Sequence, residues 1–164
     1  MAYVDQPGTS DRSATGITCV FCAKAASTDD VRNLVVARSE RVYVLLNLFP
    51  YNNGHLMVVP YAHLDNFQHL DEATSLDLMR TAQRAQAALE HAFHPEAYNV
   101  GMNLGRVAGA GIADHLHLHI VPRWNGDTNF MPVLGETKVL PDALEPSCLK
   151  IRAAWSELAS KHGW

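Results

Sequence analysis

The sequence predicts an α+β fold in which an antiparallel sheet of about five strands carries one main helix and a C-terminal helix. Three observations predict it: short apolar runs separated by turn residues, a long segment without glycine or proline, and a second helical stripe near the C-terminus. The 164 residues, 48% hydrophobic and 18% charged, suit one folded domain rather than a disordered chain.

Composition also limits the function classes. The formal net charge is -4, so we expect no broad cationic face for nucleic acid, although a small anionic ligand needs only a local site. No apolar run approaches the roughly 20 residues that span a bilayer, so no membrane association is expected. Three cysteines, an odd number, do not make a disulfide framework, which predicts a reducing compartment, the cytoplasm. The unusual count is nine histidines, three of them within five residues.

The N-terminal part is expected to contain an arm and three strands. Residues 1–16 are polar and aperiodic, which predicts a flexible arm before a folded domain over residues 17–164. The apolar runs at 34–37, 41–49 and 54–60 predict strands. Turn residues separate the last two runs, so they are expected to form an antiparallel pair.

The remaining elements are predicted from the spacing of their apolar residues. Residues 71–93 lack glycine and proline and repeat apolar side chains at helical spacing, with Asp71 as the expected cap. Residues 98–104 predict a strand, 105–114 a glycine-containing loop, and 115–121 a strand that Pro122 ends. A final stripe predicts the C-terminal helix and consists of Leu144, Cys148, Ile151, Trp155 and Leu158.

Histidines alternate with leucine and isoleucine from His115 to Ile120. Because side chains on a strand alternate, His115, His117 and His119 are expected on one face. Three interpretations compete: a solvated sheet face, ligands of a catalytic metal, or a nucleophilic histidine tuned by its neighbours. A neutral imidazole attacks phosphorus and also leaves well, so the third interpretation allows a covalent phosphoramidate intermediate.

Two stretches of the sequence resemble the histidine triad (HIT) family. Residues 115–121, His-Leu-His-Leu-His-Ile-Val, match the family signature, and residues 47–60 resemble the family's nucleoside-contacting strand pair. The resemblance covers roughly residues 17–130. Residues 47–52, 98–105 and 122–130 resemble the branch that cleaves dinucleoside polyphosphates, including bacterial diadenosine tetraphosphate (Ap4A) phosphorylases.

The resemblance implies a role for each of several residues. His117 would attack the α-phosphorus, His119 would hold phosphoryl oxygens, and His55 would lie near the phosphates across the cleft. Asn47 would contact the ribose, and Asn103 would orient the phosphates or the leaving group. Backbone N–H groups from Gly109 to Gly111 would add donors. The loop departs from the family, because residues 109–114 carry no Ser, Thr or Gln before the triad.

Cys19 and Cys22 have a spacing that allows two thiolates to bind one metal ion, although a redox pair or two buried thiols are alternatives. The resemblance implies that His63 and His115 complete the site as a structural zinc centre. Cys148 lies on the C-terminal stripe, where a core position is expected.

Together these observations predict an enzyme that cleaves Ap4A-like substrates through a nucleotidyl-histidine, with water or phosphate as acceptor and no catalytic cofactor. The alternatives are a purine nucleoside phosphoramidate hydrolase, a nucleotide-binding protein without turnover, and a metallohydrolase that uses the triad as ligands. The resemblance also implies a homodimer paired through the main helix and the sheet edge.

Overall fold

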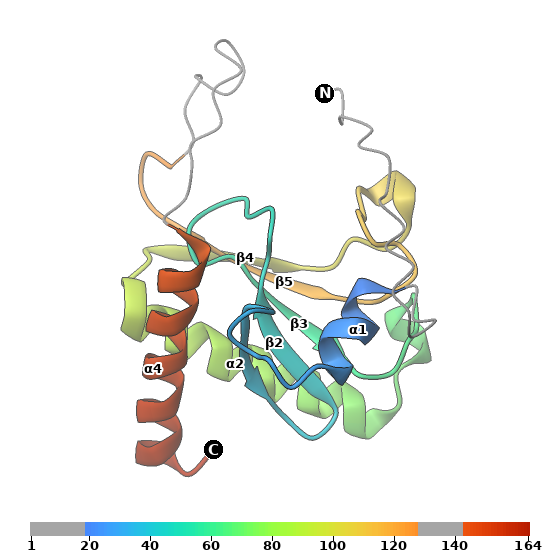
Figure 1. Cartoon of the computed structure of the whole chain (residues 1–164). Helices are drawn as coiled ribbons and strands as arrows, with labels where there is room; N and C mark the ends of the chain where they lie inside the picture. Colours follow the sequence, from blue (N-terminus) through green and yellow to red (C-terminus); the bar gives the residue numbers. More distant parts are fainter. Residues whose placement is uncertain (1–18, 128–142) are drawn as a thin grey trace.

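The computed structural model describes residues 19–127 and 143–164, so the predicted arm at 1–16 lies outside the described residues. Five strands form one antiparallel sheet in the order β1-β2-β3-β5-β4, which confirms the predicted fold class (Figure 1). The strands are β1 (Val35–Arg38), β2 (Val42–Leu46), β3 (Leu56–Pro60), β4 (Ala97–Gly101) and β5 (Leu118–Arg123).

The two predicted helices are present as α2 (Glu72–Phe93) and α4 (Leu144–His162). Asp71 caps α2 as predicted, because its carboxylate accepts a hydrogen bond from the Thr74 N–H at 2.6 Å. The short helix α1 (Val20–Ala26) was not predicted, and two 3-10 turns, η1 (Phe67–His69) and η2 (Arg106–Ala108), complete the described elements. No helix among the described residues is long and apolar enough to cross a membrane.

Helices cover both faces of the sheet. α2 and α4 pack on one face, where alternate residues of β2, β3 and β5 join the helix stripes in the larger core cluster. α1 belongs to a second cluster on the other face, in which Phe21 meets Tyr43, Leu45 and Met57. Every residue of β2 and β3 is therefore buried, and the strands that support the histidines are held from both sides.

Strand β5 differs from the prediction at both ends. It begins at Leu118 rather than His115, because the ladders with β3 and β4 start at Leu118 and His119. It also continues through Pro122 to Arg123, so the expectation that Pro122 ends the strand was wrong. β3 pairs with β5 only as far as Ile120, and the Pro122 carbonyl faces Asn52. Pro122 stays paired with Tyr98 of β4, and its missing N–H falls on the other side, where β3 no longer pairs with β5.

Candidate functional site

The sheet register brings the predicted histidines together. His119 is paired with Met57 of β3 and with Gly101 of β4, so it projects from the face that carries α1. His55 precedes β3 and points its Nε2 at His119 Nδ1, 2.9 Å away. The rings of His117 and His119 are 4.8 Å apart, and all three histidines are buried.

Hydrogen bonds fix the tautomers of His55 and His119. The Tyr51 backbone N–H donates to His55 Nδ1 at 3.1 Å, so this nitrogen carries a lone pair. The proton of neutral His55 is therefore on Nε2, which donates to His119 Nδ1. His119 in turn carries its proton on Nε2, the nitrogen that is left to face a ligand.

His117 has the opposite arrangement. Its Nδ1–H donates to the His115 carbonyl at 2.8 Å, so the unprotonated nitrogen of the neutral ring is Nε2. The ring packs against Phe21 of α1, with centroids 5.1 Å apart. The site thus presents one unprotonated nitrogen, from His117, beside one N–H donor, from His119.

Burial keeps these imidazoles neutral. Burial lowers the pKa of His117. Burial and the neighbouring His117 ring together lower the pKa of His119 to about 4. Burial and the two neighbouring rings lower the pKa of His55 to about 3. All three rings are therefore uncharged at neutral pH, so His117 keeps its lone pair.

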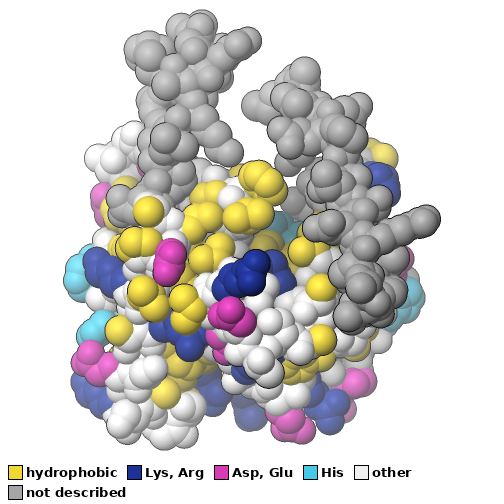
Figure 2. All heavy atoms as spheres, viewed as in Figure 1, with side chains coloured by type: hydrophobic (Ala, Val, Ile, Leu, Met, Phe, Trp, Pro, Cys, Tyr) yellow, Lys and Arg dark blue, Asp and Glu magenta, His cyan; other side chains and the backbone are white. Residues whose placement is uncertain are grey.

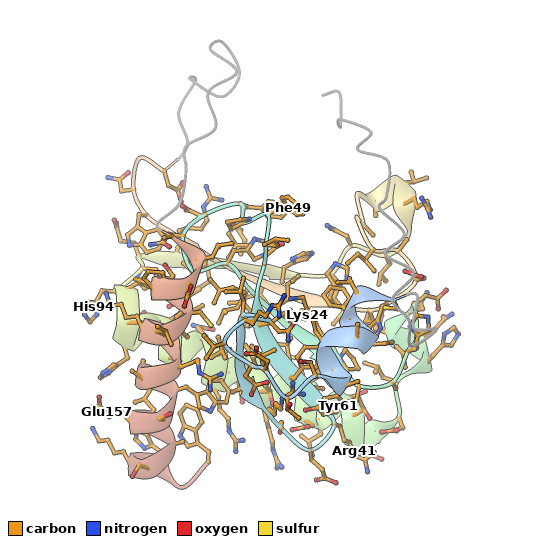
Figure 3. All side chains as sticks on the ribbon, in the orientation of Figure 1. Lys24, Arg41, Phe49, Tyr61, His94 and Glu157 are labelled. Carbon is orange, nitrogen blue, oxygen red and sulfur yellow. The ribbon has the colours of Figure 1, made fainter. Side chains whose placement is uncertain are left out.

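The connection between β2 and β3 forms a wall beside these histidines. The Tyr51 ring lies against His55 and His119, with centroids 4.7 and 5.8 Å away. Leu48, Phe49 and Tyr51 expose large hydrophobic surfaces, and a hydrophobic patch is visible in the upper middle of the face in Figure 2. Phe49 lies at the outer end of this connection (Figure 3).

Asn47 lies at the start of the same connection. Its side-chain oxygen accepts from the Phe49 N–H at 3.0 Å, and its Nδ2 is 3.4 Å from His55 Nδ1. The structure thus places Asn47 where it supports the loop and His55, and the predicted ribose contact stays a prediction.

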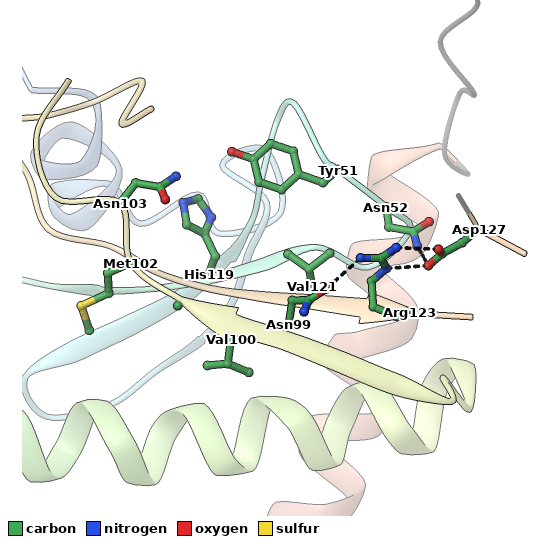
Figure 4. Close-up of a pocket in the computed structure, with 11 residues that line it drawn as sticks. Tyr51, Asn52, Asn99, Val100, Met102, Asn103, His119, Val121, Arg123 and Asp127 are labelled. Carbon is green, nitrogen blue, oxygen red and sulfur yellow. Dashed lines mark hydrogen bonds and ion pairs between the residues drawn. The ribbon is translucent and has the colours of Figure 1, made fainter. Parts of the chain in front are cut away.

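A cleft of about 370 Å³ begins at His119 and follows β5 (Figure 4). Tyr51, Asn103 and His119 lie at one end, and Asn52, Arg123 and Asp127 lie at the other; the predicted role of Asn103 in orienting phosphates stays a prediction. The wall between them is formed mainly by the residues Asn99, Val100, Gly101, Met102 and Val121.

The far end of the cleft is a connected polar network. Asp127 binds Arg123 through two contacts of 2.7 Å, and it also accepts from Asn52 Nδ2 at 2.8 Å and from the Trp124 N–H at 3.0 Å. Arg123 Nη1 donates to Asn99 Oδ1 at 2.8 Å. The Arg123 guanidinium lowers the pKa of Asp127 to about 2, so the pair is charged but has no net charge.

The predicted glycine donors have different environments. The Gly109 N–H donates to the Arg106 carbonyl at 3.0 Å, where the chain leaves η2 with a φ of 88°. This N–H is already used within the turn, so the structure does not support Gly109 as a donor to a ligand. The Gly111 N–H has no protein acceptor among the described residues, and neither glycine lines the cleft.

A second cluster lies beside His117 and contains the four predicted metal ligands. One donor atom each from Cys19, Cys22, His63 and His115 lies within 4.8 Å of all the others. His63 Nδ1 and His115 Nδ1 are 3.2 Å apart. Cys19 Sγ lies 3.3 Å from His115 Nδ1. Cys22 Sγ lies 3.6 Å from His115 Nδ1 and 3.3 Å from His63 Nδ1. This group can hold a metal ion, and no other such group occurs within residues 19–127 and 143–164.

The surroundings of this cluster favour a bound cation. His115 Nε2 donates to the Pro60 carbonyl at 2.9 Å, which leaves the Nδ1 lone pair facing the cluster. Burial and the adjacent Cys19 raise the pKa of Cys22 to about 11. Two thiolates at this position need a positive ion to offset their repulsion.

Comparison with known proteins identifies the class to which this fold and these two clusters belong. The HIT domain family profile matches residues 29–126, more than half of the chain, and the chain therefore belongs to the HIT family. Within that family, it is 44% identical over 127 residues to the protein named AP-4-A phosphorylase of Mycobacterium tuberculosis, covering 77% of this chain. The chain spans only 65% of the length of that relative.

Two further relatives carry information about the site. This chain is 28% identical over 109 residues to an adenosine 5'-monophosphoramidase of Schizosaccharomyces pombe. The match covers 66% of this chain and 77% of that relative. The crystal structure of a zinc-bound histidine triad family protein from Mycobacterium smegmatis superposes with a TM-score of 0.70 and 27% identity, covering 88% of this chain and 98% of that one.

The sequence did not single out Tyr51 or the polar network of the cleft. Tyr51 and Asn52 appear in the sequence as turn residues, and only the fold places them beside His119 and Asp127. Arg123 and Asp127 are four residues apart, which was the one local signal for their pairing.

Proposed function

We propose that this protein is an enzyme that cleaves Ap4A-like dinucleoside polyphosphates through a nucleotide bound covalently to His117. The observation that carries the proposal is the pairing of an unprotonated Nε2 on His117 with an N–H donor on His119, in a buried site of neutral imidazoles. The 44% identity to the AP-4-A phosphorylase of M. tuberculosis supports this substrate class.

In the first step, His117 Nε2 attacks the α-phosphorus and forms a phosphorus–nitrogen bond. The bond from phosphorus to the bridging oxygen breaks, and ATP leaves. His119 Nε2–H hydrogen-bonds to a phosphoryl oxygen, where negative charge increases in the transition state. Tyr51 and His55 are positioning residues, because their hydrogen bonds keep the proton of His119 on Nε2.

In the second step, an acceptor oxygen attacks the same phosphorus, and His117 leaves with its electron pair. Water as acceptor gives AMP, and inorganic phosphate gives ADP. Asn103 lies at the cleft end near His119, where it orients the phosphates or the leaving group. Gly111, whose N–H is uncommitted, lies in the loop that precedes the triad and is our candidate for an additional backbone donor.

The four-residue cluster is proposed as a structural zinc site. Zinc bonds of about 2.05 Å to nitrogen and 2.3 Å to sulfur give tetrahedral edges of about 3.3 Å between nitrogens and 3.6 Å between nitrogen and sulfur. The distances of 3.2 to 3.6 Å in the cluster fit these edges. A bound zinc ion would join α1 to the residues before β5. Thiolate ligands also suit the reducing cytoplasm, where we place the protein.

Product analysis tests the proposed function. Purified protein is incubated with Ap4A, with and without inorganic phosphate, and the nucleotides are separated. ATP with ADP, formed only when phosphate is present, indicates a phosphorylase, whereas ATP with AMP indicates a hydrolase. Binding of Ap4A without any turnover would refute the proposal.

A phosphoramidate substrate is the second candidate, because the same nucleophile serves it and a phosphoramidase is among the relatives. In that reaction an amine leaves instead of ATP, and water releases AMP. A higher kcat/KM for adenosine 5'-phosphoramidate than for Ap4A would favour this candidate.

We further propose a homodimer formed through the edge strand β4 and helix α2. β4 is the last strand of the sheet, and Val100 on it and Leu76 and Met79 on α2 are about half exposed. Light scattering should give twice the chain mass for the wild type and a lower mass for Val100→Lys. A monomeric wild type would refute this assembly.

A further inference from the structure

We infer that the cleft between His119 and Arg123 binds the nucleoside of the departing nucleotide. The inference rests on the proposed cleavage of dinucleoside polyphosphates and assigns their second nucleoside to residues of this chain. It is carried by the position of the cleft, by its charge and by the groups that line it.

The position of the cleft suits a leaving group. His117 packs toward Phe21 and α1, whereas the cleft starts at His119 and extends away from His117. An in-line displacement expels its leaving group on the side of phosphorus opposite the nucleophile. Arg123 lies four residues beyond His119, about 13 Å along the strand. This distance leaves room for several phosphate groups before the second nucleoside.

The charge of the far end suits a neutral ligand. Arg123 is the one cationic side chain among the residues that line the cleft, and Asp127 holds it through two hydrogen bonds. Asp127 is only 11% exposed, so its carboxylate stays on the guanidinium. A phosphate placed here would approach a carboxylate, whereas sugar hydroxyls carry no charge and are not repelled. The phosphates are therefore assigned to the histidine end.

The lining groups can recognise a nucleoside. Asn99 uses its Oδ1 to accept from Arg123, and its Nδ2 has no partner among the described residues, so it is free to donate to a hydroxyl. Val121, paired with Asn99, adds apolar surface beside it (Figure 4). Tyr51 borders the opposite end of the cleft, beside His119, to which the phosphates are assigned.

Binding measurements in an inactive background test the inference. The His117→Ala variant is titrated by calorimetry with Ap4A and with adenosine 5'-tetraphosphate, which has the same phosphate chain but only one nucleoside. We expect Ap4A to bind about tenfold more tightly. Asn99→Ala should lower this ratio about three- to tenfold by removing a hydroxyl contact. Gln83→Ala, on the exposed surface of α2, is the control and should leave the ratio unchanged.

Two outcomes would overturn the inference: equal dissociation constants for the two ligands, or a ratio that Asn99→Ala does not change, as in an equal loss of affinity for both ligands. The last result would place the retained nucleotide in the cleft. Far-UV circular dichroism of each variant confirms that it is folded. Turnover of Ap4A by the wild type decides the proposed function separately, because binding by the His117→Ala variant requires no chemistry.

Discussion

Acidification from pH 7 to pH 5 should destabilise this protein strongly, because two buried histidines are neutral in the fold. His55 and His119 have pKa values of about 3 and about 4 in place of the usual 6.5. The unfolded chain takes up protons at these positions as the pH falls through 6.5, and the folded chain does not. Each histidine therefore lowers the free energy of unfolding by about 2 kcal/mol at pH 5, or about 4 kcal/mol together. The loss stops growing below the two folded pKa values.

Urea unfolding at pH 7 and pH 5, followed by tryptophan fluorescence, measures this loss. His55→Asn keeps an acceptor for the Tyr51 N–H but removes one titrating ring, so its loss should be about 2 kcal/mol. The exposed His69 provides the control, and His69→Gln should behave as the wild type. The metal ligands are the same in all three proteins, so acid release of a metal does not affect the comparison. Equal losses for the wild type and His55→Asn would refute the reasoning.

Three further substitutions test local parts of the account. Cys22→Ser should lower the zinc content, measured by atomic emission, from about one ion per chain. Cys148→Ser is the control and should retain the zinc. Full zinc retention by Cys22→Ser would exclude the proposed ligand set. Asp71→Ala removes the acceptor for the Thr74 N–H and should lower the free energy of unfolding by about 1 kcal/mol. The Tm should therefore fall by about 2–4 °C. An unchanged Tm would show that the cap contributes nothing. Gly54→Ala should lower stability by about 2 kcal/mol in urea unfolding, because Gly54 has a φ of +70° and an added Cβ lies 3.0 Å from a side-chain carbon of α2; wild-type stability would contradict this.

Elements with strong periodicity could be predicted from the sequence. The main helix was predicted over 71–93 and observed as Glu72–Phe93, since both its cap and its apolar stripe are local signals. The alternation of histidine with leucine and isoleucine correctly placed Leu118 and Ile120 in the core beneath α2. The four candidate metal ligands also come together, because the spacing of the cysteines and the family pattern both constrain them.

Features that depend on tertiary contacts could not be predicted in this way. Helix α1 has only seven residues and no repeating stripe, and it is held by the burial of Phe21 beneath the sheet. The tautomer of His119 depends on a backbone N–H of Tyr51, acting through His55. The contact between Asn52 and Asp127 joins positions 75 residues apart, so neither residue stands out in the sequence.

Trapping the covalent intermediate tests the central claim most directly. Wild-type protein is mixed with Ap4A, denatured rapidly at alkaline pH, where phosphorus–nitrogen bonds persist, and analysed by intact mass and peptide mapping. The account predicts a nucleotidyl group on His117 and the loss of both adduct and turnover in His117→Ala. An adduct on another residue, or full turnover by His117→Ala, would contradict it.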